Sequence, residues 1–387
     1  MTAGNVAVGD DPGLVEAEHA FALTADLVRI RSYPGEEAAV QAYVADWFRS
    51  NGLAPDVEIV APDRPNVLVR VENGPGPVFL LNGHVDTVLA DPGWAHDPWQ
   101  GRRDGDRFYG LGACDMKSGV AAAMLATRAL ARNRDRWSGT VLFTSVVDEE
   151  AYSIGANALI DSGIKADYCV VTEASWELPC LGSFGKYLVR VDVTGRGAHA
   201  SWPERGTNAA VEAAKLVARL DEMQLPRHAR IRPSQCVLSL LSGSPQYVIT
   251  VPDRATILIN RHTIPGETEE SVLAEYQALI DGLDSPATFT LSIDPPRYPS
   301  WETPESHPLV QAFAAAYTDE AGHEPNFGYT GYGDPNLFST VAGIPTVMFG
   351  PLGGNYHEAN EWVDISSIAG TARVLERLVQ DMLPPHV

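Results

Sequence analysis

Residues 78–87 read VFLLNGHVDT, and this stretch decides the fold class. Its first half is a short apolar run that ends at Asn82-Gly83, a pattern typical of a strand buried on both faces. His84 and Asp86 follow at once, where the strand would end. A strand of this kind belongs to a sheet that helices cover, so the stretch predicts an α/β fold with polar side chains at the end of a central strand.

The segments around this strand alternate between strand and helix patterns. Apolar, β-branched runs at 141–147 and 168–171 predict further strands. Apolar side chains recur at helical spacing in 16–29, 38–51 and 118–131. Strands that alternate with helices predict an α/β domain with a largely parallel sheet flanked by helices.

The pattern changes about halfway along the chain. Residues 188–194 alternate strictly between apolar and polar side chains, and the elements that follow are expected in the order βαββαβ, the ferredoxin-like arrangement. A proline-rich stretch at 295–304 then leads back to the first pattern. We therefore predict an inserted α+β domain at 186–296, with 1–185 and 297–387 forming the first and second parts of the larger domain.

The composition excludes several classes of partner. The chain has 387 residues, with 28 Lys and Arg against 50 Asp and Glu, a formal net charge of −22. It lacks the basic surface that nucleic acid or an anionic membrane requires, so neither is expected as a partner. No apolar run is long enough for a membrane span, and no signal peptide is apparent. The 4 cysteines form no CxxC pair, which favours the reducing cytoplasm.

Acidic and histidine side chains gather where predicted strands end or a helix begins. They are His84, Asp86, Asp115, Glu149, Glu150, Glu173 and His357. In an open α/β sheet, ligands bind in the crevice beyond the carboxyl ends of the strands. So many like charges on one rim would repel one another unless cations neutralised them. Mixed histidine and carboxylate ligands suit zinc, with cobalt or manganese as alternatives, and one bridging carboxylate can hold two ions about 3.5–4 Å apart.

Short motifs across the chain resemble the M20 metallopeptidase family. They are GHVDT at 83–87, GACDMK at 112–117, DEE at 148–150, GAHAS at 197–201 and HEANE at 357–361. The family includes acetylornithine deacetylase, succinyl-diaminopimelate desuccinylase, aminoacylase and glutamate carboxypeptidase. The motifs occur in the family's order and spacing over nearly the whole chain.

The resemblance implies a centre with two divalent metal ions, zinc in the first place. Asp115 would bridge the two ions. Glu150 and His357 would complete one site, and His84 and Glu173 the other.

The resemblance also implies the catalytic roles. Asp86 would orient the His84 imidazole, and Glu149 would be the general base and acid. His199 would reach the active site of a partner protomer and stabilise the oxyanion, although a structural turn residue is an alternative at this position. The inserted domain, 186–296, would form the interface of a homodimer.

The substrate-binding residues depart from the family's pattern. Many relatives carry Asp-x-Arg or Asn-x-Arg near the end of a strand of the inserted domain, where this chain has Asn260-Arg261-His262. Because strand side chains alternate, Arg261 points to the opposite face from His262. The missing guanidinium leads us to expect a substrate other than an ordinary N-acetyl amino acid with a free carboxylate. The candidate substrate contacts are Asn208 (alternatively a helix N-cap), Arg261, His262, Gly333 and Tyr356.

The resemblance therefore predicts a dinuclear metal-dependent hydrolase that cleaves the amide bond of an N-acylated amino acid or a related small N-acyl compound. A dipeptidase or carboxypeptidase of the same family is the alternative. A non-catalytic dimeric binding protein is a more distant one, because such a protein would have lost a ligand or Glu149, and none is missing.

Overall fold

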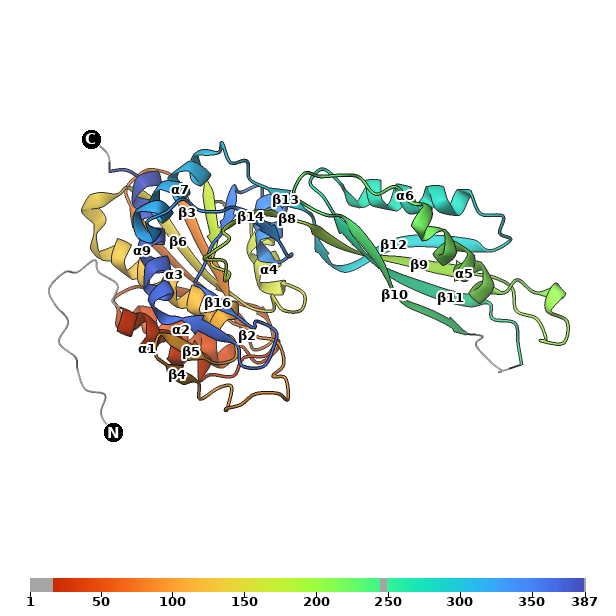
Figure 1. Cartoon of the computed structure of the whole chain (residues 1–387), viewed down its shortest axis with the longest axis horizontal. Helices are drawn as coiled ribbons and strands as arrows, with labels where there is room; N and C mark the ends of the chain where they lie inside the picture. The colour runs from red at the N-terminus through yellow and green to blue at the C-terminus, as the bar shows by residue number, and fades with distance from the viewer. Residues whose placement is uncertain (1–16, 244–248, 386–387) are drawn as a thin grey trace. The chain divides into compact units, whose positions relative to one another are not determined.

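The structure of the protein is a computed structural model that describes residues 17–243 and 249–385. The chain forms two compact units (Figure 1). The first comprises Met1–Leu181, Thr303–Gly328 and Ala342–Val387, and the second comprises Gly182–Glu302 and Tyr329–Val341. The segment Tyr329–Val341, which the sequence analysis assigned to the larger domain, thus clusters with the smaller unit.

The larger sheet has nine strands, in the order β1-β2-β6-β3-β7-β15-β8-β13, with β14 paired to β8. Most of its strands belong to the first unit, and the strands at one edge are β8 (Cys180–Ser183), β13 (Trp301–Glu302) and β14 (Gly328–Thr330). Its central strands are parallel: β6 (Gly139–Val146), β3 (Val78–His84), β7 (Tyr168–Val171) and β15 (Thr346–Met348). On one side β2 (Arg64–Asn73) and β1 (Pro55–Ala61) are antiparallel. The predicted α/β fold is confirmed, and its parallel sheet has antiparallel flanks.

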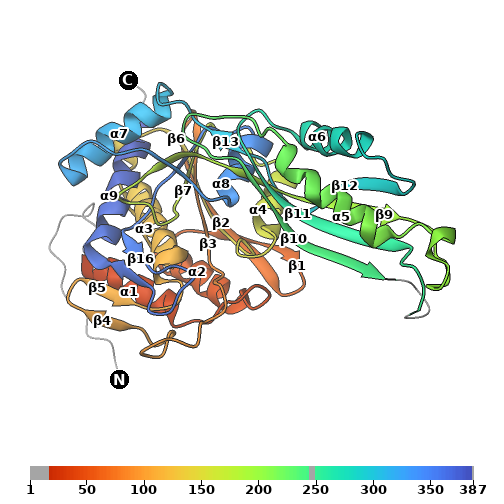
Figure 2. The same cartoon turned by 45° about the vertical axis from the view of Figure 1, so that its right-hand side comes forward.

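Helices pack on this sheet as the sequence pattern indicates. Figures 1 and 2 show α1 (Ala17–Val28), α3 (Ser118–Arg132), α7 (Pro308–Ala321) and α9 (Ile365–Met382) packed together. The helices α2 (Ala38–Ser50) and α4 (Ile154–Asp161) pack near β1 and β2. None of the helices in the described part of the chain is long and apolar enough to cross a membrane.

One glycine brings α3 against the end of β7. A Cβ on Gly119 would lie 1.8 Å from the carbonyl oxygen of Thr172, so a side chain here would separate helix and strand. Because Thr172 precedes Glu173 and α3 begins just after Asp115, this close approach places two predicted metal ligands near each other.

The second unit is a four-stranded antiparallel sheet covered by two helices. Its elements are β9 (Gly185–Thr194), α5 (Ala209–Arg219), β10 (Ser234–Gly243), β11 (Arg254–Thr263), α6 (Glu269–Asp281) and β12 (Thr288–Tyr298). The strand order β10-β11-β9-β12 is that of a ferredoxin-like fold, as predicted. Val189, Val191 and Val193 of β9 belong to the core that the sheet forms with α5 and α6, so alternate residues of β9 lie on the other face.

Candidate metal centre

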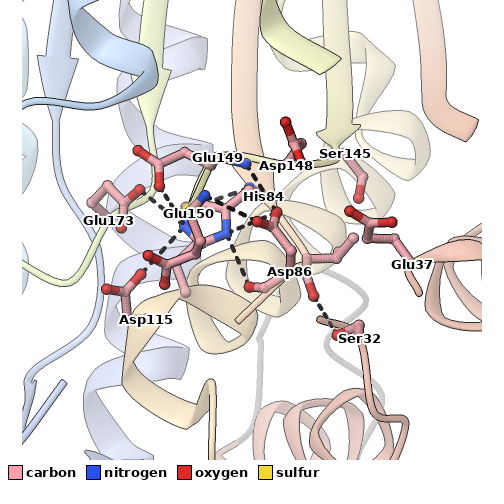
Figure 3. A network of polar contacts seen from close by, with 12 residues as sticks. Ser32, Glu37, His84, Asp86, Asp115, Ser145, Asp148, Glu149, Glu150 and Glu173 are labelled. Carbon is pink, nitrogen blue, oxygen red and sulfur yellow. Dashed lines mark hydrogen bonds and ion pairs between the residues drawn. The ribbon is translucent and has the colours of Figure 1, made fainter. Parts of the chain in front are cut away.

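The predicted metal ligands converge in the first unit. Each lies where an element ends or begins: His84 at the end of β3, Asp115 before α3, Glu150 after β6, Glu173 after β7, and His357 in the loop between β16 (Gly353–Gly354) and β17 (Trp362–Asp364). Figure 3 shows the side chains of His84, Asp115, Glu149, Glu150 and Glu173 pointing toward one another. The carboxyl ends of the parallel strands thus bring together residues that are distant in sequence.

Asp115 lies between the two histidines. Its Oδ1 is 3.3 Å from Nε2 of His84, and its Oδ2 is 3.2 Å from Nε2 of His357. On the far side of His84, the same Nε2 lies 3.3 Å from Glu173 Oε1. On the far side of His357, Nε2 lies 3.0 Å from Glu150 Oε2. The two oxygens of one carboxylate therefore face two separate clusters, each with one histidine and one further carboxylate.

The donor set fits divalent cations. Potential ligand atoms of His84, Asp115 and Glu150 lie within 4.8 Å of one another, and so do those of His84, Glu149 and Glu173. Nε2 of His84 is buried and makes no hydrogen bond in the described part of the chain, although carboxylate oxygens surround it. Histidine nitrogens and carboxylate oxygens in such an arrangement are typical ligands of zinc and neighbouring transition metals.

The electrostatics also indicate that this cluster needs positive charge. Burial and the negative charge of Asp115 raise the pKa of Glu173 to about 7, and the same two causes raise the pKa of Glu150. Hydrogen bonds to Asp115 and Glu150 raise the pKa of His357 to about 11. The cluster therefore tends to bind protons, and divalent cations would neutralise its carboxylates instead.

The tautomer of His84 is set by Asp86. Nδ1 of His84 lies 3.1 Å from the backbone carbonyl oxygen of Asp86, to which it donates, and 3.5 Å from the Asp86 carboxylate. A proton on Nδ1 leaves Nε2 with its lone pair directed into the cluster. The expected orienting contact is thus made by the Asp86 carbonyl, since only that contact has the geometry of a hydrogen bond.

The carboxylate of Asp86 has a second role, which the sequence did not reveal. Its Oδ1 accepts a hydrogen bond from the backbone N–H of Glu149 at 3.2 Å, and its Oδ2 accepts one from Glu150 at 3.0 Å. Figure 3 shows Asp86 beside His84, with dashed lines from its carboxylate to this backbone and to the imidazole. One buried carboxylate therefore fixes the backbone that carries the predicted base and one predicted ligand.

A buried ion cluster holds the same turn from the other side. Arg64, at the start of β2, donates from Nε to Glu37 Oε2 at 3.0 Å, and its Nη2 contacts both Glu37 and Asp148. The side chains of Arg64, Glu37 and Asp148 are 17%, 0% and 3% exposed. Asp148 directly precedes Glu149, so a single guanidinium anchors the acidic turn. Sequence analysis missed Arg64, because nothing in the spacing links it to Glu37 or Asp148.

Glu361 holds the segment that carries Asp115. Its Oε1 accepts hydrogen bonds from the backbone N–H groups of Cys114 at 2.7 Å and Asp115 at 2.9 Å, and its Oε2 accepts one from Gly112 at 2.8 Å. The residue is 1% exposed, and burial raises the pKa of its carboxyl to about 8. Glu361 ends the HEANE motif, but no role had been assigned to it.

The remaining predicted catalytic and substrate residues lie mostly in the second unit. His199 is exposed there; its Nδ1 accepts a hydrogen bond from the Ser201 N–H at 3.1 Å, and its ring centroid lies 5.3 Å from that of Trp202. Asn208 is the N-cap of α5 and accepts from the N–H groups of Ala210 and Val211. Asn208 thus makes the contacts of a helix N-cap, which the sequence analysis gave as its alternative role.

Arg261 and His262 lie on opposite faces of β11. Arg261 is 0% exposed and pairs with Glu267 and Glu275, which leaves it no surface for a substrate. His262 is partly buried on the other face. The expectation that the two side chains point in opposite directions agrees with this burial.

The last two candidate substrate contacts, Gly333 and Tyr356, lie in different units. Gly333, in the second unit, is buried, and its N–H donates to Asn336 Oδ1 at 3.0 Å at the start of α8 (Asp334–Asn336). Tyr356, in the first unit, is 56% exposed, and its ring centroid lies 6.3 Å from that of His357. Of the two, only Tyr356 adjoins a predicted ligand.

Histidine–carboxylate centres at the strand ends of an α/β sheet occur in metal-dependent hydrolases. The sequence matches the model of peptidase family M20/M25/M40 over residues 80–381, and the chain belongs to this family. The predicted family and its class of chemistry, hydrolysis of amide bonds, are confirmed.

Named relatives cover nearly the whole chain. It is 29% identical over 385 residues to a succinyl-diaminopimelate desuccinylase of Methylobacterium radiotolerans, covering 94% of this chain and 97% of the relative. Its fold resembles aminopeptidase PepT from Bacillus cereus, with a TM-score of 0.77, 21% identity and coverage of 96% and 100%. It also resembles a dinuclear metal binding peptidase of Bacillus subtilis, with a TM-score of 0.73, 16% identity and coverage of 94% and 97%.

Proposed function

We propose that the protein is a dinuclear metal-dependent amidohydrolase that removes the acyl group from an N-acylated amino acid or a related small N-acyl compound. The observation that carries this proposal is the placement of Asp115, whose two carboxylate oxygens face His84 and His357 separately. The desuccinylases among its relatives, which their name describes as removing a succinyl group, support the deacylase reaction.

The chain's own residues divide into two ligand sets. His84 and Glu173 would hold one ion and Glu150 and His357 the other, with Asp115 shared between the two sets. Zinc is the expected ion, with cobalt or manganese as alternatives. When bound, such ions lower the pKa of a coordinated water toward neutrality and polarise the scissile carbonyl.

Glu149 acts as the general base and then as the general acid in this proposal. Its Oε2 lies 3.8 Å from Nε2 of His84, at the edge of the cluster, and its backbone is fixed by Asp86. Its carboxylate accepts a proton from the attacking water as the oxygen bonds to the amide carbon. The same carboxyl then donates that proton to the amide nitrogen as the C–N bond breaks, so a carboxylic acid and an amine leave and Glu149 is ionised again.

The inserted segment 186–296 serves as lid and dimerisation domain in this proposal. Its edge strand β10 exposes Leu238, Leu240 and Leu241, and a second copy would cover them. In the dimer His199 would act at the active site of the partner protomer. Sedimentation of the wild type and of Leu241→Glu tests this: a dimer that dissociates in the variant supports the interface, and a monomeric wild type contradicts it.

The cysteines are consistent with a cytoplasmic enzyme. Cys114, Cys169, Cys180 and Cys236 are all free thiols, and the first three are buried. Buried free thiols are typical of proteins that fold in a reducing compartment.

The decisive experiment measures amine release from a panel of N-acyl amino acids and dipeptides by the zinc- or cobalt-loaded protein. Glu149→Gln should lower turnover by about 10²–10⁴-fold, because it removes the proton acceptor. Glu72→Gln, an exposed glutamate on β2, is the matched control and should leave turnover unchanged. Turnover confined to dipeptides would favour the peptidase alternative, and an active Glu149→Gln would refute the assigned mechanism.

A further inference from the structure

The end of helix α1 contacts two of the segments that carry ligands of the metal centre. Residues 27–32, here called the α1 tether, comprise the last two residues of this helix and the irregular segment that follows it. The tether supplies no ligand of the proposed centre. Any influence on the centre therefore passes through the segments that the tether holds.

Ser32 joins the tether to the segment after β3. Its hydroxyl donates to the backbone carbonyl oxygen of Val85 at 2.6 Å, and its own carbonyl oxygen accepts from the N–H of Thr87 at 3.0 Å. Ser32 is buried, and Figure 3 shows its side chain beside this segment. The two hydrogen bonds fix the residues on either side of Asp86, which in turn orients His84.

Lys117 joins the tether to the segment that carries Asp115. It is 1% exposed, and its Nζ donates to the backbone carbonyl oxygens of Leu27 at 3.1 Å and Ile30 at 2.8 Å. The C-terminal end of a helix leaves carbonyl oxygens to be satisfied by other groups and favours a cation. Because Lys117 is two positions after Asp115, the tether holds this segment as well.

The two tethered segments also pack directly against each other. The backbone N–H of His84 donates to Met116 Sδ at 3.3 Å. A Cβ on Gly112, whose φ is 77°, would lie 2.6 Å from Thr87 Cγ2 and 3.3 Å from Lys117 Cδ. The segment after β3 and the segment before α3 are thus in close contact at the positions that the tether holds.

We propose that Ser32 and Lys117 are positioning residues of the metal centre, which hold these two segments through the α1 tether and so set the distance between His84 and Asp115. The inference rests on the proposed function and deepens it, because it names residues on which the geometry of its centre depends. One short stretch of backbone is common to both sets of hydrogen bonds. A displacement of the tether would therefore change the 3.3 Å separation between Nε2 of His84 and Oδ1 of Asp115.

Metal affinity separates positioning from simple electrostatics at Lys117. The negative charges of Glu361 and Asp86 act on its ammonium group. Loss of a positive charge beside the centre would by itself strengthen the binding of a cation. Loss of a supporting contact would weaken it, typically by about 10–100-fold. The two explanations thus predict opposite signs for Lys117→Met, which removes the donor and nearly keeps the length of the side chain.

Competition with a chromogenic chelator measures the zinc affinity of each variant. We expect Lys117→Met and Ser32→Ala each to bind zinc at least about tenfold more weakly than the wild type. Arg128→Met, which removes a partly buried cation of α3, and Ser138→Ala, which removes a hydroxyl bonded to a backbone carbonyl, are the matched controls and should keep the wild-type affinity. Wild-type or tighter binding by Lys117→Met would overturn the proposal. If Lys117→Met does not fold, Ser32→Ala decides in the same way.

The double variant shows whether the two residues act through one segment. Independent contacts would multiply their two losses of affinity, whereas residues that hold the same tether should together lose less than the product. The visible absorption of the cobalt-loaded protein, which reports ligand geometry, should change in both single variants and in neither control. A full product of the two losses, or an unchanged cobalt spectrum, would contradict the shared tether.

These binding measurements need no turnover, so they separate the positioning role from the proposed function. A wild type that binds zinc no more tightly than the two variants would overturn the positioning role alone. The expected affinities in a protein that hydrolyses no amide would support the positioning role and refute the proposed function alone. A wild type that binds no zinc would overturn both.

Discussion

Asp115 and His357 lie 3.2 Å apart, although the first precedes α3 and the second occupies a loop near the end of the chain. The other oxygen of the same carboxylate lies 3.3 Å from His84. A side chain with a single acceptor oxygen at this position would lose one of the two contacts. The arrangement makes this aspartate the residue on which both halves of the centre depend.

Asp115→Asn should therefore weaken both metal sites at once. An amide presents one oxygen and one NH₂ group, so it cannot offer an acceptor to each histidine's ion. We expect amine release to fall by at least about 10³-fold and the metal content after dialysis to fall for both ions. Asp161→Asn, an exposed aspartate of α4, is the control, and metal content is read by atomic emission. Full retention of both ions in Asp115→Asn would contradict the bridging role.

Arg64→Gln should destabilise the protein and slow turnover. It leaves the buried carboxylates of Glu37 and Asp148 without a counter-charge, a change that typically costs about 3–5 kcal/mol in free energy of unfolding. The turn that carries Glu149 would lose one of its two anchors, so kcat of the folded fraction should fall while KM changes little. Chemical denaturation and steady-state kinetics measure the two effects separately.

Two further variants test the explanation for Arg64. Arg373→Gln breaks the more exposed Arg373–Glu320 pair, away from the centre, and should cost less stability with no effect on kcat. The triple variant Glu37→Gln, Arg64→Met, Asp148→Asn removes all the charges together and should regain much of the lost stability. If the triple variant is no more stable than Arg64→Gln, unpaired buried charge is not the cause of the stability that Arg64→Gln loses.

Glu361→Gln should lower metal affinity without touching a ligand. A glutamine amide places an NH₂ group against a backbone N–H that the carboxylate now accepts, so the segment from Gly112 to Asp115 would shift. Loss of such a supporting contact typically costs about 10–100-fold in metal affinity. Competition with a chromogenic chelator measures the affinity, and Glu358→Gln, an exposed residue of the same motif, is the control. Identical affinities in the two variants would rule out a positioning role for Glu361.

The Asp106–Asp364 pair predicts a pH dependence of stability. Burial and the hydrogen bond with Asp106 raise the pKa of Asp364 from its usual value of 3.8 to about 6. A raised carboxyl pKa means that the folded state binds the extra proton, so this group's contribution to stability is favourable at low pH and is lost as pH rises from about 4 to about 6. Asp364→Asn should therefore gain stability relative to the wild type as pH rises through this window. Chemical denaturation at pH 4.5 and at pH 7.5 measures the free energy of unfolding of both proteins. If the difference between the two proteins is the same at both pH values, Asp106 and Asp364 do not share a proton.

The sequence predicted those parts of the centre that depend on a single segment. His84, Glu150 and Glu173 each follow a strand whose apolar run is visible in the sequence, and parallel strands bring their ends to one edge. The ferredoxin-like unit was also predictable, because the alternation at 188–194 marks a sheet with one covered face.

Contacts between segments were not predictable in the same way. Arg64 is important only because β2, α2 and the turn after β6 meet at its guanidinium. The membership of Tyr329–Val341 in the second unit likewise depends on packing.

The dispersed origin of the ligands has a thermodynamic consequence. Residues from β3, β6, β7, the start of α3 and the loop before β17 meet only when the first unit is folded, so the unfolded chain offers no comparable binding site. Ions bound to this centre are then linked to folding, and each stabilises the native state by an amount that grows with the logarithm of its free concentration over its dissociation constant. A chelator should thus lower the melting temperature as well as the turnover, and the enzyme's persistence in a cell would follow the supply of its metal.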